Sequence, residues 1–443
     1  MSELVETRIG LLPWDWRVKP LSETTIKIQD GTHFSPKSED GPYRYVTSRN
    51  IQFGRLNLSN CGWISQREHD AIYARCDVKY GDVLLTKDGA NTGNASLNDQ
   101  HEPFSLLSSV AILRTDGVTH HAGFILQYLL SPLGQRRLKD LMSGNAITRL
   151  TLEKIKAFET PVPAASEQRR IAEILSTLDA TIEQTEALIA KYQQIKAGLM
   201  HDLFTRGVTP DGKLRPTRAE APHLYKQSPL GWIPKEWEVV KLGDLGRSGR
   251  PHLKTGPFGS SLKLEHWVEE GHPVITIGAL GEGEFIKSEL LFVSDTTAHR
   301  LGEYQLEPGD IVFSRVADVG RSAVIGAEHQ GWIMSSNLMR ISMESAKMRP
   351  AFLQSQLAHD SRLRAQIRAT VNSGGRDVAN SAILNRLRFV QPSLDEQDRI
   401  ADRVRALDSK RKAEMAHRDI LIKQKHGLMR DLLTGRVRVK VDS

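Results

Sequence analysis

The stretch "EQRRIAEILSTLD", from Glu167 to Asp179, decides the fold because it is written twice. A close copy, "EQDRIADRVRALD", begins 229 positions later at Glu396. At the same spacing, "KAGLMHDLFT" from Lys196 matches "KHGLMRDLLT" from Lys425, so the register survives for almost forty residues. A solenoid repeats roughly every 20 to 50 residues, so a period this long indicates a duplicated domain.

The similarity continues upstream of these stretches. "GLLPWDWRVKPL" from Gly10 resembles "GWIPKEWEVVKL" from Gly231, and "YGDVLLTK" from Tyr80 resembles "PGDIVFSR" from Pro308. Around these phrases, short β-rich runs alternate with Gly, Asn and Asp clusters, and one expected helix from Ala122 is interrupted near Pro132. The chain therefore consists of two mixed α+β halves built on one plan.

Each half ends in an expected long helix with an apolar stripe. The helix from Glu167 to Phe204 would be about 57 Å long at ~1.5 Å per residue. A heptad stripe of this length requires a partner of equal length, which favours an antiparallel intramolecular coiled coil with the second copy. The alternative is two independent amphipathic helices, each packed on its own domain. The expected pairing or docking residues are Ile171, Leu175, Leu178, Ile182, Leu199, Leu203, Ile400, Val404, Leu407, Leu421, Leu428 and Leu432.

The sequence predicts an α+β fold class, with two tandem mixed α/β globular domains, two long helices and a pseudo-two-fold internal repeat. Arg206 to Pro229 is rich in Pro, Gly and charged residues without periodicity, which is typical of a linker. The expected segments are a first domain at 1–162, a long helix at 163–206, a linker at 207–230, a second domain at 231–391, a second long helix at 392–436 and a tail at 437–443.

Composition limits the cellular setting and the partners. Lys and Arg total 60 against 53 acidic residues, so the net charge is +7, which favours polyanionic partners without proving them. The two cysteines, Cys61 and Cys76, lie in the first half only and suggest a reducing environment without a disulfide framework. There is no apolar stretch near the ~20 residues of a membrane span and no signal-peptide pattern, so we expect a cytoplasmic protein that does not bind membranes.

Motifs for catalysis are missing. The phosphate-binding G-x-x-x-x-G-K-[ST] motif is absent, since Gly212 and Lys213 are followed by Leu214. The sequence also lacks G-x-S-x-G, H-E-x-x-H, C-x-x-C and the Asn/Asp-Pro-Pro-aromatic tetrapeptide of amino-methyltransferases. We therefore predict no catalytic, cofactor-binding or metal-ligating residues in this chain, and binding is favoured over catalysis.

Three pairs of polar or basic loops occupy matching places in the two halves. Lys and Arg neutralise phosphates, and Arg, Asn and Asp form the expected major-groove pairings with guanine, adenine and cytosine. Each residue alone is better explained as a solvated surface group than as a base contact, but matched loops favour a DNA-binding face. The candidates are His33, Lys37, Arg44, Arg49, Asn50, Lys87, Asp88, Asn91, Asn145 and Arg149 in the first half, and Arg250, Lys254, Ser260, Lys263, Arg315, Asp318, Arg321 and Arg376 in the second.

These phrases together resemble the specificity subunit of Type I restriction-modification systems over the whole chain. The opening phrase G-x-x-P-x-x-W-x-x-x-x-L begins at Gly10 and at Gly231, and the closing phrase E-Q-x-x-I-A leads twice into a helix that ends in G-L-M-x-D-L. The resemblance implies that each half is a target recognition domain that reads one part of a split DNA site. It also implies that the paired helices hold the two readers apart and dock two modification subunits.

The resemblance further implies a division of labour among subunits. The partners would be double-stranded DNA, two modification (methyltransferase) subunits that use S-adenosylmethionine to methylate adenine, and restriction subunits that use ATP and magnesium to move along and cleave DNA. Two other hypotheses stay open: a coiled-coil scaffold whose globular ends bind protein, and a self-contained enzyme with a disguised active site. Apolar helix faces left bare would also make the isolated chain prone to aggregate.

Overall fold

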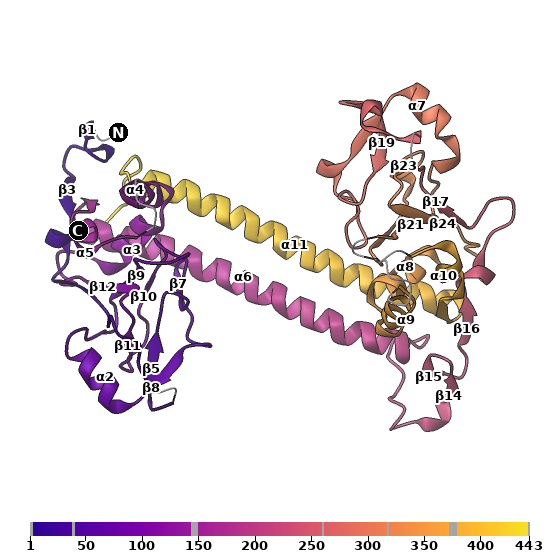
Figure 1. Cartoon of the computed structure of the whole chain (residues 1–443), viewed down its shortest axis with the longest axis horizontal. Coiled ribbons are helices and arrows are strands. Elements are labelled where there is room, and N and C mark those ends of the chain that lie inside the picture. Colours follow the sequence, from indigo (N-terminus) through magenta and orange to yellow (C-terminus); the bar gives the residue numbers. More distant parts are fainter. Residues whose placement is uncertain are drawn as a thin grey trace. The chain divides into compact units, whose positions relative to one another are not determined.

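The computed structural model describes residues 3–37, 40–142, 149–258, 261–316, 319–371 and 379–441. The chain divides into two compact units, shown in Figure 1. Unit 1 consists of Met1–Ala187 and Met415–Ser443, and unit 2 is Leu188–Glu414. Each unit contains one mixed α/β domain and a part of each of two long helices.

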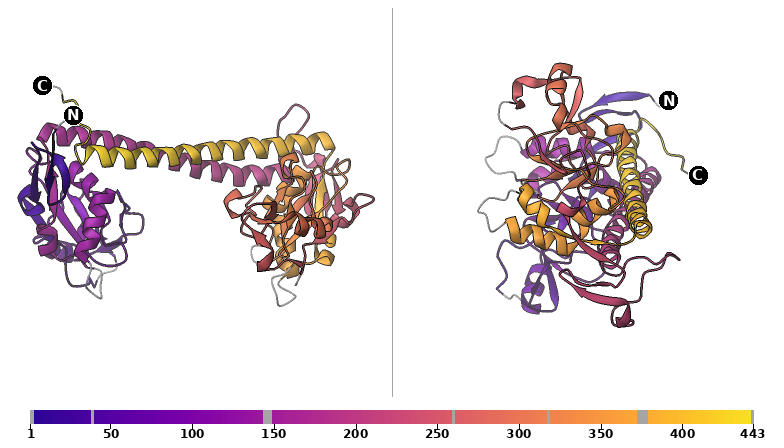
Figure 2. Two further views of the ribbon diagram at one scale, coloured as in Figure 1. Left: turned by 90° about the horizontal axis from the view of Figure 1, so that it is seen from above. Right: turned by 90° about the vertical axis from the view of Figure 1, so that its right-hand side faces the viewer.

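The two long helices are α6 (Ala165–Thr205) and α11 (Leu394–Leu432). In unit 1 the first part of α6 lies beside the last part of α11, where Asp179 pairs with Lys425. In unit 2 the last part of α6 lies beside the first part of α11, where Lys196 pairs with Asp408. The two helices therefore run side by side in opposite directions (Figures 1 and 2). This confirms the predicted antiparallel coiled coil.

The apolar stripe is buried most deeply where each helix meets a globular domain. Ile171 and Leu175 join the core of unit 1, and Leu203, Ile400 and Val404 join that of unit 2. Four other stripe residues are only partly buried: Leu178, Ile182, Leu199 and Leu407. Two in the C-terminal part of α11 are buried, Leu421 and Leu432.

One residue of the pairing or docking set does not pair within the chain, and its docking role stays a prediction. Leu428 is exposed, while its neighbour Met429 is 2% exposed and belongs to the core of unit 1. The end of α11 packs onto a globular domain, and the face that this domain covers differs by one residue from the face that the heptad spacing indicates.

The domain of unit 1 is built around a four-stranded antiparallel sheet of order β10-β9-β12-β4. It also contains a three-stranded sheet of order β11-β5-β8. Two helices, α3 and α4, follow the sheet, with the expected break before Pro132. The strands of these sheets are β4 (Lys27–Asp30), β5 (Tyr43–Val46), β8 (Gly62–Ile64), β9 (Val83–Thr86), β10 (Ala95–Leu97), β11 (Ser105–Leu106) and β12 (Val110–Arg114). The helices are α1 (Leu21–Thr24), α2 (Gln66–Tyr73), α3 (Ala122–Leu130), α4 (Pro132–Met142) and α5 (Leu152–Lys156).

Three strand pairs complete unit 1. They are β1 (Leu4–Thr7) with β2 (Gly10–Pro13), β3 (Arg17–Pro20) with β13 (Glu159–Val162), and β6 (Ile51–Gln52) with β7 (Arg55–Leu56). The principal core joins the four-stranded sheet and α3 to Ile171 and Leu175 of α6 and to Met429 and Leu432 of α11. Both long helices are thus part of the fold of this unit.

Unit 2 repeats this plan with two four-stranded sheets, of order β17-β24-β21-β22 and β18-β20-β19-β23. The strands are β17 (Leu253–Thr255), β18 (Trp267–Val268), β19 (His272–Ile275), β20 (Leu291–Val293), β21 (Ile311–Ser314), β22 (Ser322–Val324), β23 (Ile333–Met334) and β24 (Leu338–Ile341). The pairs β14 (Tyr225–Ser228) with β15 (Gly231–Pro234) and β16 (Glu238–Lys241) with β25 (Arg388–Gln391) complete the strands. The α-helices of the domain are α7 (Asp295–Arg300), α8 (Pro350–His359), α9 (Ser361–Val371) and α10 (Ser381–Arg386).

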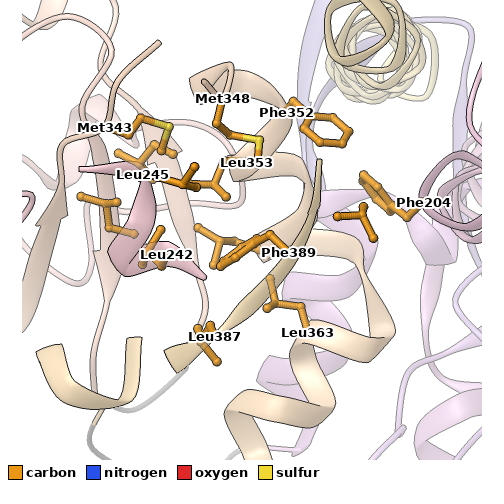
Figure 3. Close-up of a cluster of buried hydrophobic side chains, with 14 of the residues drawn as sticks. Phe204, Leu242, Leu245, Met343, Met348, Phe352, Leu353, Leu363, Leu387 and Phe389 are labelled. Atoms are coloured by element: carbon orange, nitrogen blue, oxygen red, sulfur yellow. The ribbon is translucent and has the colours of Figure 1, made fainter. Parts of the chain in front are cut away.

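The largest core of unit 2 gathers side chains from α6, α8, α9, β25 and α11. Figure 3 shows Phe204 of α6 near Phe352 of α8, with Phe389 of β25 among leucines below them. The rings of Phe204 and Phe352 are 6.1 Å apart at their centroids, which suits a tilted aromatic pair. Burial of these aromatic rings attaches the end of α6 to the second domain.

The segment expected to be an unstructured linker is partly structured. Its end forms η1 (Pro222–Leu224) and β14, whose hairpin with β15 corresponds to the β1–β2 hairpin of unit 1. Arg215, inside the same segment, is 7% exposed and pairs with Glu396 at the start of α11. The compositional signal could not reveal the hairpin or this buried contact.

The described helices include none that has both the length and the apolar content needed to cross a membrane.

Candidate nucleic-acid interface

Four segments of unit 1 meet at one end of its four-stranded sheet, and we call them loop cluster 1: residues 31–37, 47–50, 87–93 and 107–109, with Arg149 and Leu150 beside them. The backbone N–H of Lys87 donates to the Ser109 carbonyl at 2.8 Å, and the Leu150 N–H donates to the Lys87 carbonyl at 2.8 Å. The Ser48 N–H donates to Ser109 Oγ, and Thr32 forms a β-bridge with Leu107. The structure thus brings together the first-half loops that the sequence singled out.

A buried ion pair lies beneath this cluster. Lys87 Nζ is 3.2 Å from Asp30 Oδ2, and both side chains are only 3% exposed. Asp30 also pairs with Arg75 at 2.9 Å and lies 3.5 Å from the His33 ring. Because Asp30 neutralises Lys87 and the protein covers it, Lys87 positions the loops and does not present a charge to DNA. The prediction that Lys87 contacts DNA is therefore not supported.

The other first-half candidates divide into three groups. Asn50 is buried in a turn, where it accepts from the Thr47 N–H at 2.9 Å and donates to the Asn57 carbonyl at 3.0 Å, so its predicted base contact is not supported. Lys37 and Arg44 lie beside α2 and β8 respectively, because the Lys37 N–H donates to Glu68 and Arg44 stacks on Trp63. The residues that remain on the exposed or partly exposed surface of loop cluster 1 are His33, Arg49, Asp88, Asn91 and Arg149.

Unit 2 builds the equivalent end of its sheet with the same backbone hydrogen bonds. We call it loop cluster 2: residues 256–258, 315–316, 319–321, 335–337 and 379–380. The Arg315 N–H donates to the Asn337 carbonyl at 3.1 Å, and the Ala379 N–H donates to the Arg315 carbonyl at 2.8 Å. Arg315 therefore occupies the place that Lys87 has in unit 1. The two halves share a backbone frame and differ in the side chains that it carries.

Arg315 differs from Lys87 in its surroundings. Its guanidinium lies 5.4 Å from the centre of the Phe258 ring, and its Nε donates to the Ala379 carbonyl at 3.3 Å. Burial lowers the pKa of the Arg315 guanidinium below its usual value. Burial is the one cause of this shift, with no contribution from a carboxylate in the described part of the chain, so the charge of Arg315 is available to an anionic partner.

Two second-half candidates lie elsewhere in unit 2. Arg250 and Lys254 are near the start of β17, whereas Gly256 and loop cluster 2 follow its end. Arg250 pairs with Glu307 at 2.7 Å, and Lys254 pairs with Glu303 at 2.6 Å. With Arg340 they line a polar cavity of about 440 Å³. Neither residue belongs to loop cluster 2, since Arg250 precedes β17 and Lys254 is its central residue, and their contact with DNA stays a prediction.

The remaining second-half candidates have mixed outcomes. Lys263 is exposed near η4 (Leu264–His266), and Arg321 is half-buried and donates to the Leu280 carbonyl at 2.9 Å. Four candidates lie outside the described residues: Asn145, Ser260, Asp318 and Arg376. In the part of the chain that the structure describes, no group of three or more His, Cys, Asp or Glu side chains could hold a metal ion.

Sequence reasoning missed the turns that join the loops. Ser109 and Asn337 accept the hydrogen bonds of Lys87 and Arg315, and both lie just before the strand of their sheet that comes last in the chain, β12 or β24. The available signal was the similarity of "LSSVAIL" from Leu107 to "SSNLMRI" from Ser335. Such short polar turns are recognised only when the two halves are aligned strand by strand.

The family model of the Type I restriction modification DNA specificity domain matches residues 13–194 and 234–423, which is most of both halves. The chain belongs to this family. Each of the two matches contains one globular domain and its loop cluster.

Relatives and solved structures of this family agree with the assignment. The chain is 25% identical to the Type I restriction enzyme MjaVIII specificity subunit of Methanocaldococcus jannaschii, over 97% of this chain and 94% of that protein. It is 22% identical to the Type I restriction enzyme EcoKI specificity subunit of Escherichia coli K12, over 90% of this chain and 83% of that protein. The crystal structure of a Type-I restriction-modification system S subunit from M. genitalium has the same fold, with a TM-score of 0.61, 18% identity and coverage of 94% and 96%.

Proposed function

We propose that this member of the specificity family is the DNA-reading subunit of a Type I restriction-modification complex. Loop cluster 1 contacts one half of a split DNA site, and loop cluster 2 contacts the other half. The chain itself is non-catalytic, and the complex methylates adenine and cleaves DNA through other subunits.

The observation that carries this proposal is a shared backbone frame with different side chains. The same two backbone hydrogen bonds fix Lys87 in one unit and Arg315 in the other. The accessible side chains then differ, with His33, Asn91 and Arg149 in unit 1 and Arg315 in unit 2. Base edges are distinguished by the donors and acceptors that meet them, so two such frames suit the reading of two different short sequences.

The long helices support a second part of the proposal, which is that they set the spacing of the half-sites. An α-helix of 41 residues is about 61 Å long at ~1.5 Å per residue, and it is stiff where a Gly- or Ser-rich linker is not. Readers of split sites are commonly spaced near one DNA turn, about 34 Å, or a multiple of it. Insertion of one helical turn into both helices should therefore lengthen the recognised spacer.

Partner subunits supply the chemistry in this proposal. Two modification subunits dock on the chain and bring S-adenosylmethionine, and restriction subunits bring the sites for ATP and magnesium. The complex acts on double-stranded DNA in the cytoplasm. Native mass spectrometry of the assembled complex would count the modification subunits, and a count other than two would contradict this part.

Sequencing of methylated adenines in cellular DNA tests the proposal as a whole. Cells that express this chain with its cognate modification subunits should acquire a split methylation motif that is absent without the chain. Replacement of one globular domain by that of a relative should change one half of the motif only. An unchanged methylome from a folded, assembled complex would instead favour the protein-binding scaffold.

A further inference from the structure

Each loop cluster carries an exposed phenylalanine that the function proposed above does not use. Phe34 is 53% exposed in unit 1, and Phe258 is 61% exposed in unit 2. Phe34 comes three residues after Gly31, and Phe258 comes two residues after Gly256. Single exposed apolar residues are ordinary on protein surfaces, but a repeated one in the same loop of two diverged domains needs a reason.

The two glycines occupy equivalent positions in their sheets. Each follows the edge strand, β4 or β17, and donates its N–H to the first residue of the neighbouring strand, Val110 or Leu338. A Cβ at Gly31 would lie 1.9 Å from the Leu106 carbonyl oxygen. A Cβ at Gly256 would lie 2.0 Å from the carbonyl oxygen of Ser335. The chain thus leaves both sheets through the same close backbone contact, which places the two phenylalanines on corresponding loops.

Contacts within each cluster keep these loops beside the polar candidates. The Phe34 N–H donates to Thr32 Oγ1 at 3.2 Å, and Thr32 bridges to Leu107 in the turn that also holds Lys87. The Phe258 ring lies under the Arg315 guanidinium, 5.4 Å from its centre. A cation that stacks on an exposed ring presents one charged and one apolar surface to the same partner.

We propose that Phe34 and Phe258 contact DNA bases, each in the half-site that its own unit reads. Aromatic side chains contact the methyl group of thymine in the major groove, or they wedge between bases and partly unstack them. Arg315 neutralises a nearby phosphate or meets a base edge while Phe258 covers the apolar part of the base. This inference rests on the DNA-reading function proposed above.

Phe53 provides a matched control. It is 53% exposed, as Phe34 is, and it lies in the turn between β6 and β7 of the same unit. Its turn has a counterpart in unit 2, because the N–H groups of Gly54 and Gly283 donate to Ala95 and Ser322 at equivalent points, and there Glu282 takes the place of the phenylalanine. Phe53 therefore lacks the repetition that distinguishes Phe34 and Phe258.

The test uses the full chain assembled with its modification subunits and the DNA motif found by methylation sequencing. Phe34→Ala and Phe258→Ala should each weaken binding to cognate DNA roughly 10-fold, which corresponds to about 1.4 kcal/mol. Binding to unrelated DNA should change less than twofold, and Phe53→Ala should match the wild type. Phe258→Leu, which keeps an apolar side chain, should recover part of the loss and so separates contact from misfolding.

Base analogues distinguish the two kinds of contact. If Phe258 touches a thymine methyl group, uracil at one position should reproduce the loss and cause no further loss in Phe258→Ala. If the ring opens a base step, 2-aminopurine at that step should fluoresce more with the wild type than with Phe258→Ala. Either result supports a base contact.

Two results would overturn the inference. The first is cognate binding within twofold of the wild type for both alanine variants, and the second is an equal loss on cognate and unrelated DNA. A wild-type complex that shows no preference for any split motif would instead refute the proposed function, which keeps the two failures distinguishable.

Discussion

Lys196 Nζ lies 2.7 Å from Asp408 Oδ1, and the repeat places Lys425 against Asp179 in the same way. Each lysine is 229 residues from the other lysine, and the same holds for the aspartates. One ion pair between α6 and α11 is therefore used in both units. A polar pair between otherwise apolar helix faces is a recognised means of fixing helix register.

We expect the Lys196–Asp408 pair to contribute a small, measurable coupling. The two side chains are 15% and 28% exposed, so the interaction is less screened than a surface ion pair. A double-mutant cycle with Lys196→Met and Asp408→Asn, measured by urea unfolding, should give a coupling energy of about 0.5–1 kcal/mol. The same cycle on the exposed Asp402–Arg405 pair of α11 should give almost none. Equal couplings for both pairs would contradict the role in helix register.

The network at the start of α11 should be more sensitive than the interhelical pair. Glu396 is 3% exposed and accepts hydrogen bonds from Trp237 Nε1 at 3.1 Å and Arg215 Nη2 at 3.0 Å. Glu396→Ala leaves Arg215 buried without this carboxylate and should lower the free energy of unfolding by about 3–5 kcal/mol. Trp237→Phe removes one donor and should cost about 1 kcal/mol. The reverse order in chemical denaturation would show that the carboxylate is not the centre of the network.

A methyl group at Gly256 should disturb one half of the recognition site. The new Cβ would meet the Ser335 carbonyl, so the backbone of loop cluster 2 must shift. Gly256→Ala should reduce or relax methylation at the half-site of unit 2 and leave the other half of the motif unchanged. Gly302→Ala is the control, because no atom lies within 4 Å of a Cβ built there. Loss of both half-sites, or of neither, in methylation sequencing would contradict this assignment.

His359, the last residue of α8, should make the stability of unit 2 depend on pH. Burial, helped by the nearby charges of Lys196 and Arg364 and opposed by Asp408, lowers the pKa of its imidazole from 6.5 to about 4. The unfolded chain therefore binds a proton at a higher pH than the folded chain does. The contribution of His359 to the free energy of unfolding is fully present above pH 6.5 and is lost as the pH falls towards 4.

Unfolding free energies at pH 7 and pH 5 would check this expectation. His359→Gln should lose less stability than the wild type between these two pH values, because glutamine does not titrate. The exposed His201 of α6 supplies the control, and His201→Gln should follow the wild-type profile. A wild-type profile for His359→Gln as well would show that His359 does not sense pH.

The sequence predicted the helices well because their signals are local and repeated. The heptad stripe and Pro163 placed the first helix at 163–206, and the structure has it at Ala165–Thr205. The break near Pro132 was also correct, since proline cannot donate the N–H that a continuous helix needs. Leu428 does not pair with the other helix, because packing on a domain, and not helix spacing, decides which face is buried there.

The loop residues were harder to predict because long-range contacts decide their exposure. Lys87 is covered by Asp30, which lies 57 residues earlier, and no local pattern reveals that pair. Arg250 and Lys254 share a basic stretch with Phe258, yet Arg250 precedes β17 and Lys254 lies within it, and both line a cavity with Arg340. Composition located loops that contact one another in the structure; for example, the Leu150 N–H donates to the Lys87 carbonyl. It could not identify the side chains that face outward.

The composition of unit 1 has a consequence for synthesis of the chain. Its core contains Leu12 and Trp16 together with Met429 and Leu432, whereas the residues of unit 2 are continuous in the sequence. Because domains fold as they emerge from the ribosome, unit 2 can complete its core first. Unit 1 has to wait, with the apolar faces of β9, β12 and α3 incompletely covered, until α11 is finished. The domain that is translated first is the one that matures last.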